Sequence, residues 1–162
     1  MSSIKIYPSL PSDLPFIHRL LSARWGSSRI VSRGVLYDAA TLPAFIAKLE
    51  SEPVGLATYS IAGAQCQIVT LDSLAEGRGI GSALIEAVKA AAVEAGCRRL
   101  WLITTNDNLP ALGFYQKRGF VITAIHRNAL EISRRIKPEI SLYGRDGIPL
   151  RDEIELEYCL TD

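Results

Sequence analysis

The stretch Glu76-Gly77-Arg78-Gly79-Ile80-Gly81-Ser82 lies between a predicted strand and a predicted helix, and it decides the fold. Apolar residues at 66–71 precede it, and apolar residues then recur at helical spacing as far as Gly96. A glycine turn at the start of a helix exposes backbone N–H groups that no Cβ covers, and the helix dipole adds a partial positive charge. The stretch therefore predicts an anion-binding cradle. The alternative interpretation is a turn that only requires positive φ and close helix–strand packing.

Two familiar phosphate-binding motifs do not fit this turn. A Walker loop requires Lys and then Ser or Thr after its last glycine, but Gly81 is followed by Ser82-Ala83. A dinucleotide fingerprint, G-x-G-x-x-G, fails from Gly77 because its last position is Ser82, and from Gly79 because it is Leu84. The sequence therefore disfavours a P-loop enzyme and a nicotinamide oxidoreductase.

The segments around the turn predict a mixed sheet with helices packed on it. Strands are expected at residues 4–7, 45–49, 54–61, 66–71, 100–103, 120–125 and 154–160, the last as an edge strand. Helices are expected at 14–21, 80–91 and 108–117, with a helical turn at 128–135. Residues 26–38 are expected to be a long irregular segment or a short, poorly capped helix, and 138–149 to be irregular. Short connections between 45 and 71 indicate an antiparallel meander, and strand–helix–strand order after it indicates a parallel crossover.

Composition limits the class of protein. With 162 residues and 48% hydrophobic composition, we expect one domain over residues 1–162. A net charge of +1 without a basic stripe argues against a nucleic-acid partner. The three cysteines, Cys66, Cys97 and Cys159, form no metal-binding motif, so no metal is expected. The first ten residues do not form a secretion signal and no run approaches the roughly 20 apolar residues of a membrane span, so the expected location is the cytoplasm.

A second motif agrees with the glycine turn. The stretch NLPALGFYQKRGF, from Asn108 to Phe120, resembles the N-x-x-A-x-x-F-Y-x-x-x-G-F segment of the GNAT superfamily of N-acetyltransferases. The turn itself resembles that family's Q/R-x-x-G-x-G/A acyl-CoA turn, except that Glu76 stands where the family usually has Gln or Arg. In the family that position contacts phosphate largely through its main chain. The resemblance covers roughly residues 45–125 and implies an α/β (α+β) fold, with a mixed, mostly antiparallel twisted sheet of about six to seven strands and helices on both faces.

The resemblance also implies an activity and a site. The donor would be acetyl-CoA, used as a co-substrate, and the acceptor a primary amine of a small molecule or peptide. The family's sheet splays next to the pantetheine arm of CoA, and a tyrosine protonates the departing thiolate. Carried over to this sequence, the cofactor-binding residues are Thr70, Leu71, Asp72, Glu76, Gly77, Arg78, Gly79, Ile80, Gly81, Ser82, Asn108 and Tyr115.

Three residues are the catalytic candidates. Tyr115 would be the general acid, the backbone N–H of Leu71 would bind the thioester oxygen, and Asp72 is a candidate base because a protonated amine must lose a proton before attack. The alternative for Tyr115 is a core residue with its hydroxyl satisfied, and for Asp72 a turn residue that caps N–H groups.

The acceptor is expected between residues 26–38 and the C-terminal tail, which are variable regions of the family. Candidate acceptor residues are Trp25, Arg29, Arg33, Tyr37 and His126. Arginines there would suit an acidic acceptor, whereas the alternatives are solvated loop charges and a structural histidine. A non-catalytic acyl-CoA sensor is the competing function, and a homodimer is considered because many members of that family are dimers.

Overall fold

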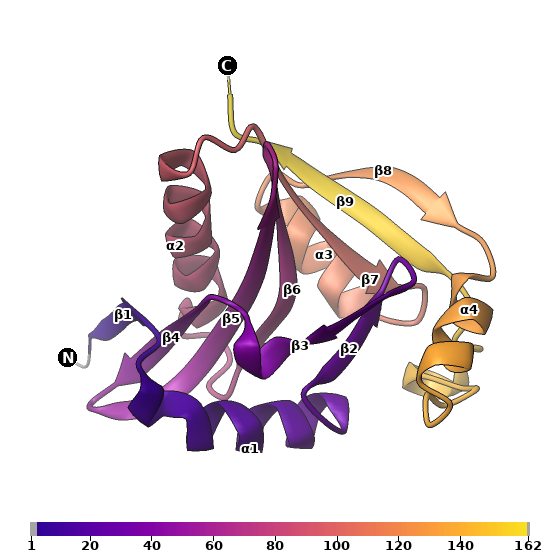
Figure 1. The fold of residues 1–162 in the computed structure, drawn as a ribbon, viewed down its shortest axis with the longest axis horizontal. Coiled ribbons are helices and arrows are strands. Elements are labelled where there is room, and N and C mark those ends of the chain that lie inside the picture. The colour runs from indigo at the N-terminus through magenta and orange to yellow at the C-terminus, as the bar shows by residue number, and fades with distance from the viewer. Residues whose placement is uncertain (1–2, 162) are drawn as a thin grey trace.

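A twisted seven-stranded sheet forms the centre of the molecule, in a computed structural model that describes residues 3–161 (Figure 1). Its strands lie in the spatial order β1 (Ile4–Pro8), β4 (Ala44–Leu49), β5 (Glu52–Ala62), β6 (Gln65–Ser73), β7 (Arg99–Thr105), β9 (Glu153–Cys159) and β8 (Val121–His126). Every neighbouring pair is antiparallel except β6 and β7, which are parallel and joined by a helical crossover. The predicted meander and the predicted crossover are therefore confirmed.

Helices cover both faces of the sheet, as expected (Figure 1). One face carries α2 (Ile80–Glu94) and α3 (Leu109–Lys117), whose apolar side chains join a core around Leu84, Leu100 and Leu156, each fully buried. The other face carries α1 (Leu14–Trp25), whose core includes Leu21 and Ile46. Burying one such side chain contributes about 1.5–3 kcal/mol, so the two cores hold the sheet between its helical layers. The remaining helix is α4 (Ala129–Ile136), and short 3₁₀ turns occur at Pro11–Asp13, Ala39–Thr41 and Arg145–Gly147.

The parallel strands β6 and β7 separate partway along their length, and this positions the site. Their ladder pairs Gln65–Ile68 with Arg99–Leu102, although β6 continues to Ser73 and β7 to Thr105. The N–H of Thr70 donates to Thr58 Oγ1 of β5 (3.2 Å), and the N–H of Leu74 donates to Val54 O (2.7 Å). Since N–H groups alternate in direction along a strand, the N–H of Leu71 points into the gap beside β7.

The expectation for residues 26–38 was wrong, because this segment is a β-hairpin of β2 (Arg29–Ser32) and β3 (Val35–Asp38). Its two-residue loop is Arg33-Gly34, with φ of +49° and +72°. Two consecutive positive φ values match the twist of a tight hairpin, and such loops usually contain Asn-Gly or Asp-Gly. The sequence did not predict this turn because arginine stands at the first loop position, where Asn or Asp would have indicated a hairpin.

The C-terminal strand was predicted as an edge strand, but β9 lies between β7 and β8, and β8 is the edge. The alternation of Glu153, Glu155 and Glu157 with apolar residues is typical of an edge. Cationic partners on the neighbouring strands make the inner position tolerable: Arg99 Nε lies 2.9 Å from Glu157 Oε1, and Arg99 also pairs with Glu155. The helical turn predicted at 128–135 is a short helix, α4. No helix within the described residues is long and apolar enough to span a membrane.

Candidate active site

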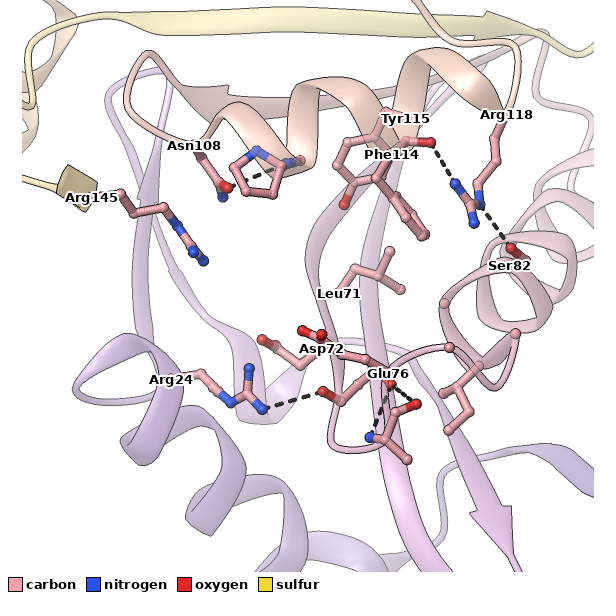
Figure 2. Close-up of a pocket in the computed structure, with 18 of the residues that line it drawn as sticks. Arg24, Leu71, Asp72, Glu76, Ser82, Asn108, Phe114, Tyr115, Arg118 and Arg145 are labelled. Carbon is pink, nitrogen blue, oxygen red and sulfur yellow. Dashed lines mark hydrogen bonds between the residues drawn. The ribbon is translucent and has the colours of Figure 1, made fainter. Parts of the chain in front are cut away.

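A cavity of about 580 Å³ lies beside the gap between β6 and β7, between the glycine turn and α3 (Figure 2). Its wall has three parts. One, called the turn end below, consists of Gly77, Gly79, Gly81, Ser82 and Arg118. The second, the junction, consists of Leu71, Asp72 and Tyr115. The third, the arginine end, consists of Arg24, Trp25 and Arg145.

The turn end exposes backbone at the N-terminus of α2. Gly77 and Gly79 have φ of +73° and +75°, values that residues other than glycine rarely adopt. The space where each Cβ would lie is open. Gly81 serves packing instead, because a Cβ there would lie 2.8 Å from Phe114 Cζ. Both interpretations of the turn therefore apply at different glycines: an open cradle suited to an anion, and close helix–helix contact.

Arg118 adds a positive charge at the turn end. Its Nε donates to Ser82 Oγ (2.7 Å), its Nη1 donates to Phe114 O (2.7 Å), and its guanidinium lies 3.5 Å from the centre of the Phe114 ring. These contacts fix the guanidinium next to the first turn of α2. The sequence analysis did not select Arg118, and the available signal was its place three residues after Tyr115 in the second motif.

Asp72 sits at the junction with one defined partner. The indole Nε1 of Trp25 donates to Asp72 Oδ2 at 2.9 Å. Burial raises the pKa of Asp72, and this hydrogen bond and the charge of Arg24 partly offset the rise. A carboxylate with a raised pKa is a better proton acceptor than one with the ordinary pKa.

Tyr115 has a packed ring and an unpaired hydroxyl. The ring meets Phe114 and Phe120 edge-on, with centroid separations of 5.2 and 5.6 Å. Within residues 3–161 the hydroxyl forms no hydrogen bond, and the side chain faces the cavity above Leu71 (Figure 2). Burial, then the negative charge of Asp72, raise the pKa of Tyr115 well above 10, so the phenol stays protonated near neutral pH. The core-packing interpretation thus describes the ring and leaves the hydroxyl unexplained.

Arg24 and Arg145, at the opposite end of the cavity from Arg118, were not selected from the sequence. Arg24 lies in the last turn of α1 and donates from Nη2 to Ser73 O (3.2 Å). Arg145 follows Gly144 in the C-terminal segment, and its backbone N–H donates to Asp107 Oδ2 (2.9 Å). Arg24 lies near the end of a helix and Arg145 lies in an irregular segment far along the chain. Nothing in the sequence indicates that these two side chains line the same cavity.

The other predicted donor-site residues are placed as follows. Asn108 lines the cavity and caps α3, since its Oδ1 accepts from Ala111 N at 3.3 Å. Glu76 lines the cavity with an exposed side chain, and Ile80 lines it although the Ile80 side chain is only 1% exposed. Arg78 belongs to the turn but not to the cavity wall. Thr70 also lies outside the wall, with Oγ1 2.7 Å from Thr58 Oγ1 in the core.

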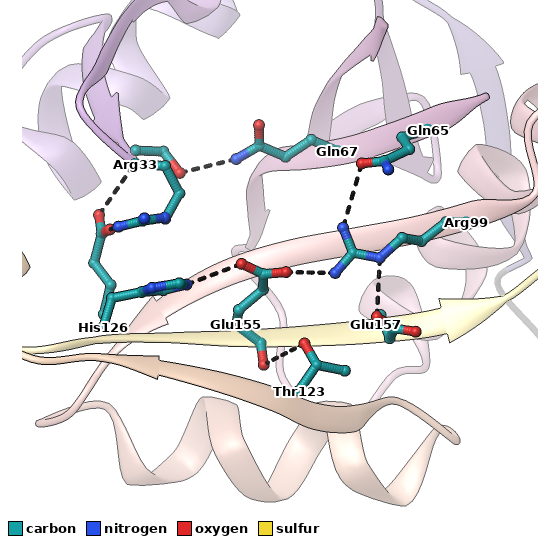
Figure 3. Close-up of polar contacts among 10 residues, drawn as sticks. Arg33, Gln65, Gln67, Arg99, Thr123, His126, Glu155 and Glu157 are labelled. Carbon is teal, nitrogen blue, oxygen red and sulfur yellow. Dashed lines mark hydrogen bonds and ion pairs between the residues drawn. The ribbon is translucent and has the colours of Figure 1, made fainter. Parts of the chain in front are cut away.

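Of the predicted acceptor residues, Trp25 lines the cavity and the other four lie outside its wall. Arg29 contributes its backbone carbonyl to Lys137, and Tyr37 donates its hydroxyl to Gln67 Oε1 (3.0 Å). Arg33 pairs with Glu153 at 3.4 Å, and His126 Nε2 lies 3.0 Å from Glu155 Oε1 (Figure 3).

The contacts of Arg33 and His126 belong to a polar network on the sheet face that carries the hairpin (Figure 3). The structural interpretation of His126 describes its contacts better than an acceptor role does. In the described part of the chain, no group of three or more His, Cys, Asp or Glu side chains is arranged to hold a metal ion.

Comparison with known proteins agrees with this geometry. The sequence model of the Acetyltransferase (GNAT) family matches residues 14–120. The chain is 45% identical over 131 residues to the uncharacterized protein YdhI of Bacillus subtilis, covering 80% of this chain and 82% of that protein. It is 39% identical over 148 residues to the uncharacterized protein YxbD of the same organism, covering 91% and 92%. The crystal structure of a GNAT family acetyltransferase from Elizabethkingia anophelis with acetyl-CoA bound has the same fold, with a TM-score of 0.68, 22% identity, and coverage of 96% and 97%.

Proposed function

Because the chain belongs to the GNAT family of acetyltransferases, we propose that it transfers the acetyl group of acetyl-CoA directly to a primary amine of a small molecule or peptide. One observation carries the proposal: a single cavity joins an open backbone turn, a free strand N–H and an unpaired phenol hydroxyl. Acyl transfer to an amine requires an anchored donor, stabilisation of the carbonyl oxygen and a proton for the leaving group.

The residues present fit acetyl-CoA. The turn end offers backbone N–H groups at a helix N-terminus and the guanidinium of Arg118, which suit the phosphates of CoA. The gap beside Leu71 offers unpaired strand backbone to the amide groups of the pantetheine arm, in the manner of an added strand. Asn108 faces the same space. When bound, acetyl-CoA supplies the activated thioester from which the acetyl group is taken.

The junction residues divide the chemistry between them. Asp72 takes a proton from the acceptor ammonium, whose pKa lies near 10, and so leaves a nucleophilic amine. The amine nitrogen then forms a bond to the acetyl carbon as the carbon–sulfur bond breaks. The N–H of Leu71 donates to the carbonyl oxygen as negative charge develops there, and such a donor typically contributes about 10²–10³ in rate.

Tyr115 acts on the departing sulfur. Its phenol carries a proton at neutral pH because the ordinary pKa of tyrosine is about 10 and burial raises it further, and its hydroxyl is not engaged by another described residue. It therefore donates to the thiolate as the amide product forms, and the second proton that the acceptor nitrogen loses restores the Tyr115 phenol. General acids of this kind contribute about 10²–10⁴ in rate.

The wider setting is also proposed. Residues 1–162 form one domain that works in the cytoplasm without metal or nucleic acid, as the charge and cysteine pattern indicate. Support for one domain comes from the tail, since β9 pairs with both β7 and β8 and so belongs to the central sheet. A homodimer is also proposed, and sedimentation measurements would test it.

A thiol-release assay tests the proposed activity. With acetyl-CoA and a panel of amino acids, polyamines, aminoglycosides and peptide N-termini, we expect release with at least one amine. Tyr115→Phe should lower kcat by about 10²–10⁴ while calorimetry still shows CoA binding. Tyr59→Phe is the matched control, because Tyr59 stacks on Phe45 (centroids 5.8 Å apart) outside the cavity wall. CoA binding without release for any amine, and no effect of Tyr115→Phe on binding, would favour the sensor function instead.

A further inference from the structure

Three arginine side chains line the cavity, and the two at the arginine end keep most of their N–H donors for a ligand. Arg118 is held by Ser82, Phe114 O and the Phe114 ring. Arg24 makes one hydrogen bond, to Ser73 O, and a guanidinium has five N–H donors. The guanidinium of Arg145 makes no hydrogen bond or ion pair with the residues that the structure describes. The arginine end therefore presents guanidinium N–H donors that no described residue uses.

The backbone at Arg145 is held by a specific arrangement. Asp107, only 7% exposed, accepts from the Arg145 N–H through Oδ2 and from Thr105 Oγ1 through Oδ1. Gly144 allows this approach, because a Cβ there would lie 2.0 Å from Asp107 Oδ2. A buried carboxylate and a sterically required glycine thus place Arg145 at the cavity.

The backbone near Arg24 is held as well. The helix α1 ends at Trp25, and Gly26, with φ of +83°, is its C-cap residue. The Nζ of Lys137, a residue only 7% exposed, donates to Trp25 O (3.1 Å) and to Arg29 O (2.7 Å). Lys137 therefore links the end of α1 to the chain segment that leads to Arg145. The backbone near Arg24 and the backbone near Arg145 are thus both held by buried charged side chains.

Charge changes sign along the cavity. The turn end carries Arg118 and open backbone N–H groups, with the exposed Glu76 beside them, Asp72 at the junction is acidic, and the arginine end carries two guanidinium groups. In Figure 2, Arg24 and Arg145 lie on the side of Asp72 away from Arg118. A ligand whose ammonium lies at Asp72 and whose anionic group lies beyond it would match this order.

We propose that the acceptor carries, besides its amine, a carboxylate or phosphoryl group that Arg24 and Arg145 bind. The proposal rests on the acetyl transfer proposed above and names the class of its acceptor. Guanidinium groups match both anions, since their N–H donors form paired hydrogen bonds to two oxygens. The anion would hold the acceptor so that its amine reaches the Leu71–Asp72 segment.

Turnover with matched amines tests this proposal. The pairs are L-amino acids with their amides, and aminoalkylphosphonates with the corresponding amino alcohols, all with acetyl-CoA as donor. We expect the anionic member to be preferred, with carboxylate and phosphonate pairs separating the two anion sources. Arg24→Gln and Arg145→Gln should each raise the KM of the anionic acceptor by about 10- to 100-fold and change the KM of acetyl-CoA less than about twofold. Arg19→Gln, an exposed arginine of the same helix outside the cavity wall, is the control and should change neither KM.

Three results would overturn the proposal. In the first, the enzyme acetylates the neutral amine of each pair as efficiently as the anionic one. In the second, the Arg→Gln variants lower the turnover of the neutral and the anionic amine equally. In the third, the variants raise the KM of acetyl-CoA instead, which would assign the arginines to the donor.

A binding measurement keeps the proposal testable if no amine is turned over. Calorimetry on the CoA-loaded protein would compare N-acetyl amino acids and N-acetyl aminoalkylphosphonates with their neutral counterparts. Binding of either anion that weakens about 10- to 100-fold in Arg145→Gln supports the proposal, and equal or absent binding of the anions rejects it. Failure of CoA itself to bind would instead reject the proposed function, and this proposal with it.

Discussion

The two ends of the cavity, in the proposed function, recognise their ligands through different parts of the chain. At the turn end, recognition comes from consecutive residues around Gly79 and mostly from backbone N–H groups. At the arginine end, it comes from the side chains of Arg24, Trp25 and Arg145, which belong to α1 and to the C-terminal segment. A site made of local backbone can be identified from a short motif, because consecutive residues set the direction of its N–H groups. A site made of distant side chains can change its ligand without disturbing the motif.

The strongest test of this contrast is at the junction between the two ends. Asp72→Asn should lower kcat by about 10²–10⁴, because an amide cannot accept the ammonium proton, while the Kd of CoA stays the same. In the unaltered protein, activity should fall as the pH falls through the raised pKa of Asp72, since the carboxyl then binds a proton. Stopped assays from pH 4 to 10 would measure both effects.

The control for Asp72→Asn is Glu86→Gln, which removes a carboxylate from a largely exposed side chain on α2. It should leave kcat unchanged. A pH profile that keeps its acid limb in Asp72→Asn would show that another group takes the proton, and the junction would then lose its assigned base.

At the arginine end, Gly144→Ala should act on the acceptor alone. The added Cβ would meet Asp107 Oδ2 at 2.0 Å and displace the Arg145 backbone. Overpacking of this kind lowers the free energy of unfolding by about 1–3 kcal/mol. The displaced Arg145 should raise the acceptor KM about as much as Arg145→Gln does, about 10- to 100-fold. Gly113→Ala is the matched control, because a Cβ at this helical glycine meets nothing within 4 Å. Equal losses of acceptor and CoA affinity in Gly144→Ala would mean that the two ends are not independent.

At the turn end, Gly79→Ala should act on the donor alone. Alanine at φ of +75° is strained by about 1–2 kcal/mol, which corresponds to a roughly 5- to 30-fold higher Kd for CoA. The acceptor KM should stay within about twofold in steady-state kinetics, again with Gly113→Ala for comparison. An unchanged Kd would show that the strain is relieved elsewhere and that the turn conformation is not needed for binding.

The smallest effect is expected outside both ends. His126→Gln removes a partly exposed contact to Glu155, and ion pairs of this kind contribute about 0–1 kcal/mol. Both KM values should stay the same, and a thermal melt should shift by only a few degrees. A large rise in the acceptor KM would extend the acceptor site to β8 and weaken the contrast drawn above.

Most of the fold could be predicted because its signals are local. The helix from Ile80 and the strand before it follow from hydrophobic periodicity, and the motif from Asn108 to Phe120 placed Tyr115 on the helix that faces the cavity. The hairpin at 29–38 was missed because Arg33 has a positive φ, which arginine rarely adopts. The position of β9 was missed because strand order depends on pairing between segments far apart in sequence.

By itself, the sequence determined the glycine turn, the helix that follows it, and the tyrosine and backbone segments beside them, since each depends on neighbours a few residues away. Only the tertiary structure decided that Arg24 and Arg145 share a cavity wall and that Arg29, Arg33 and His126 do not. The physical reason is that a side chain's exposure and partners are set by which strands and helices pack together. That packing is a collective result of the two cores, and no single stretch of residues encodes it.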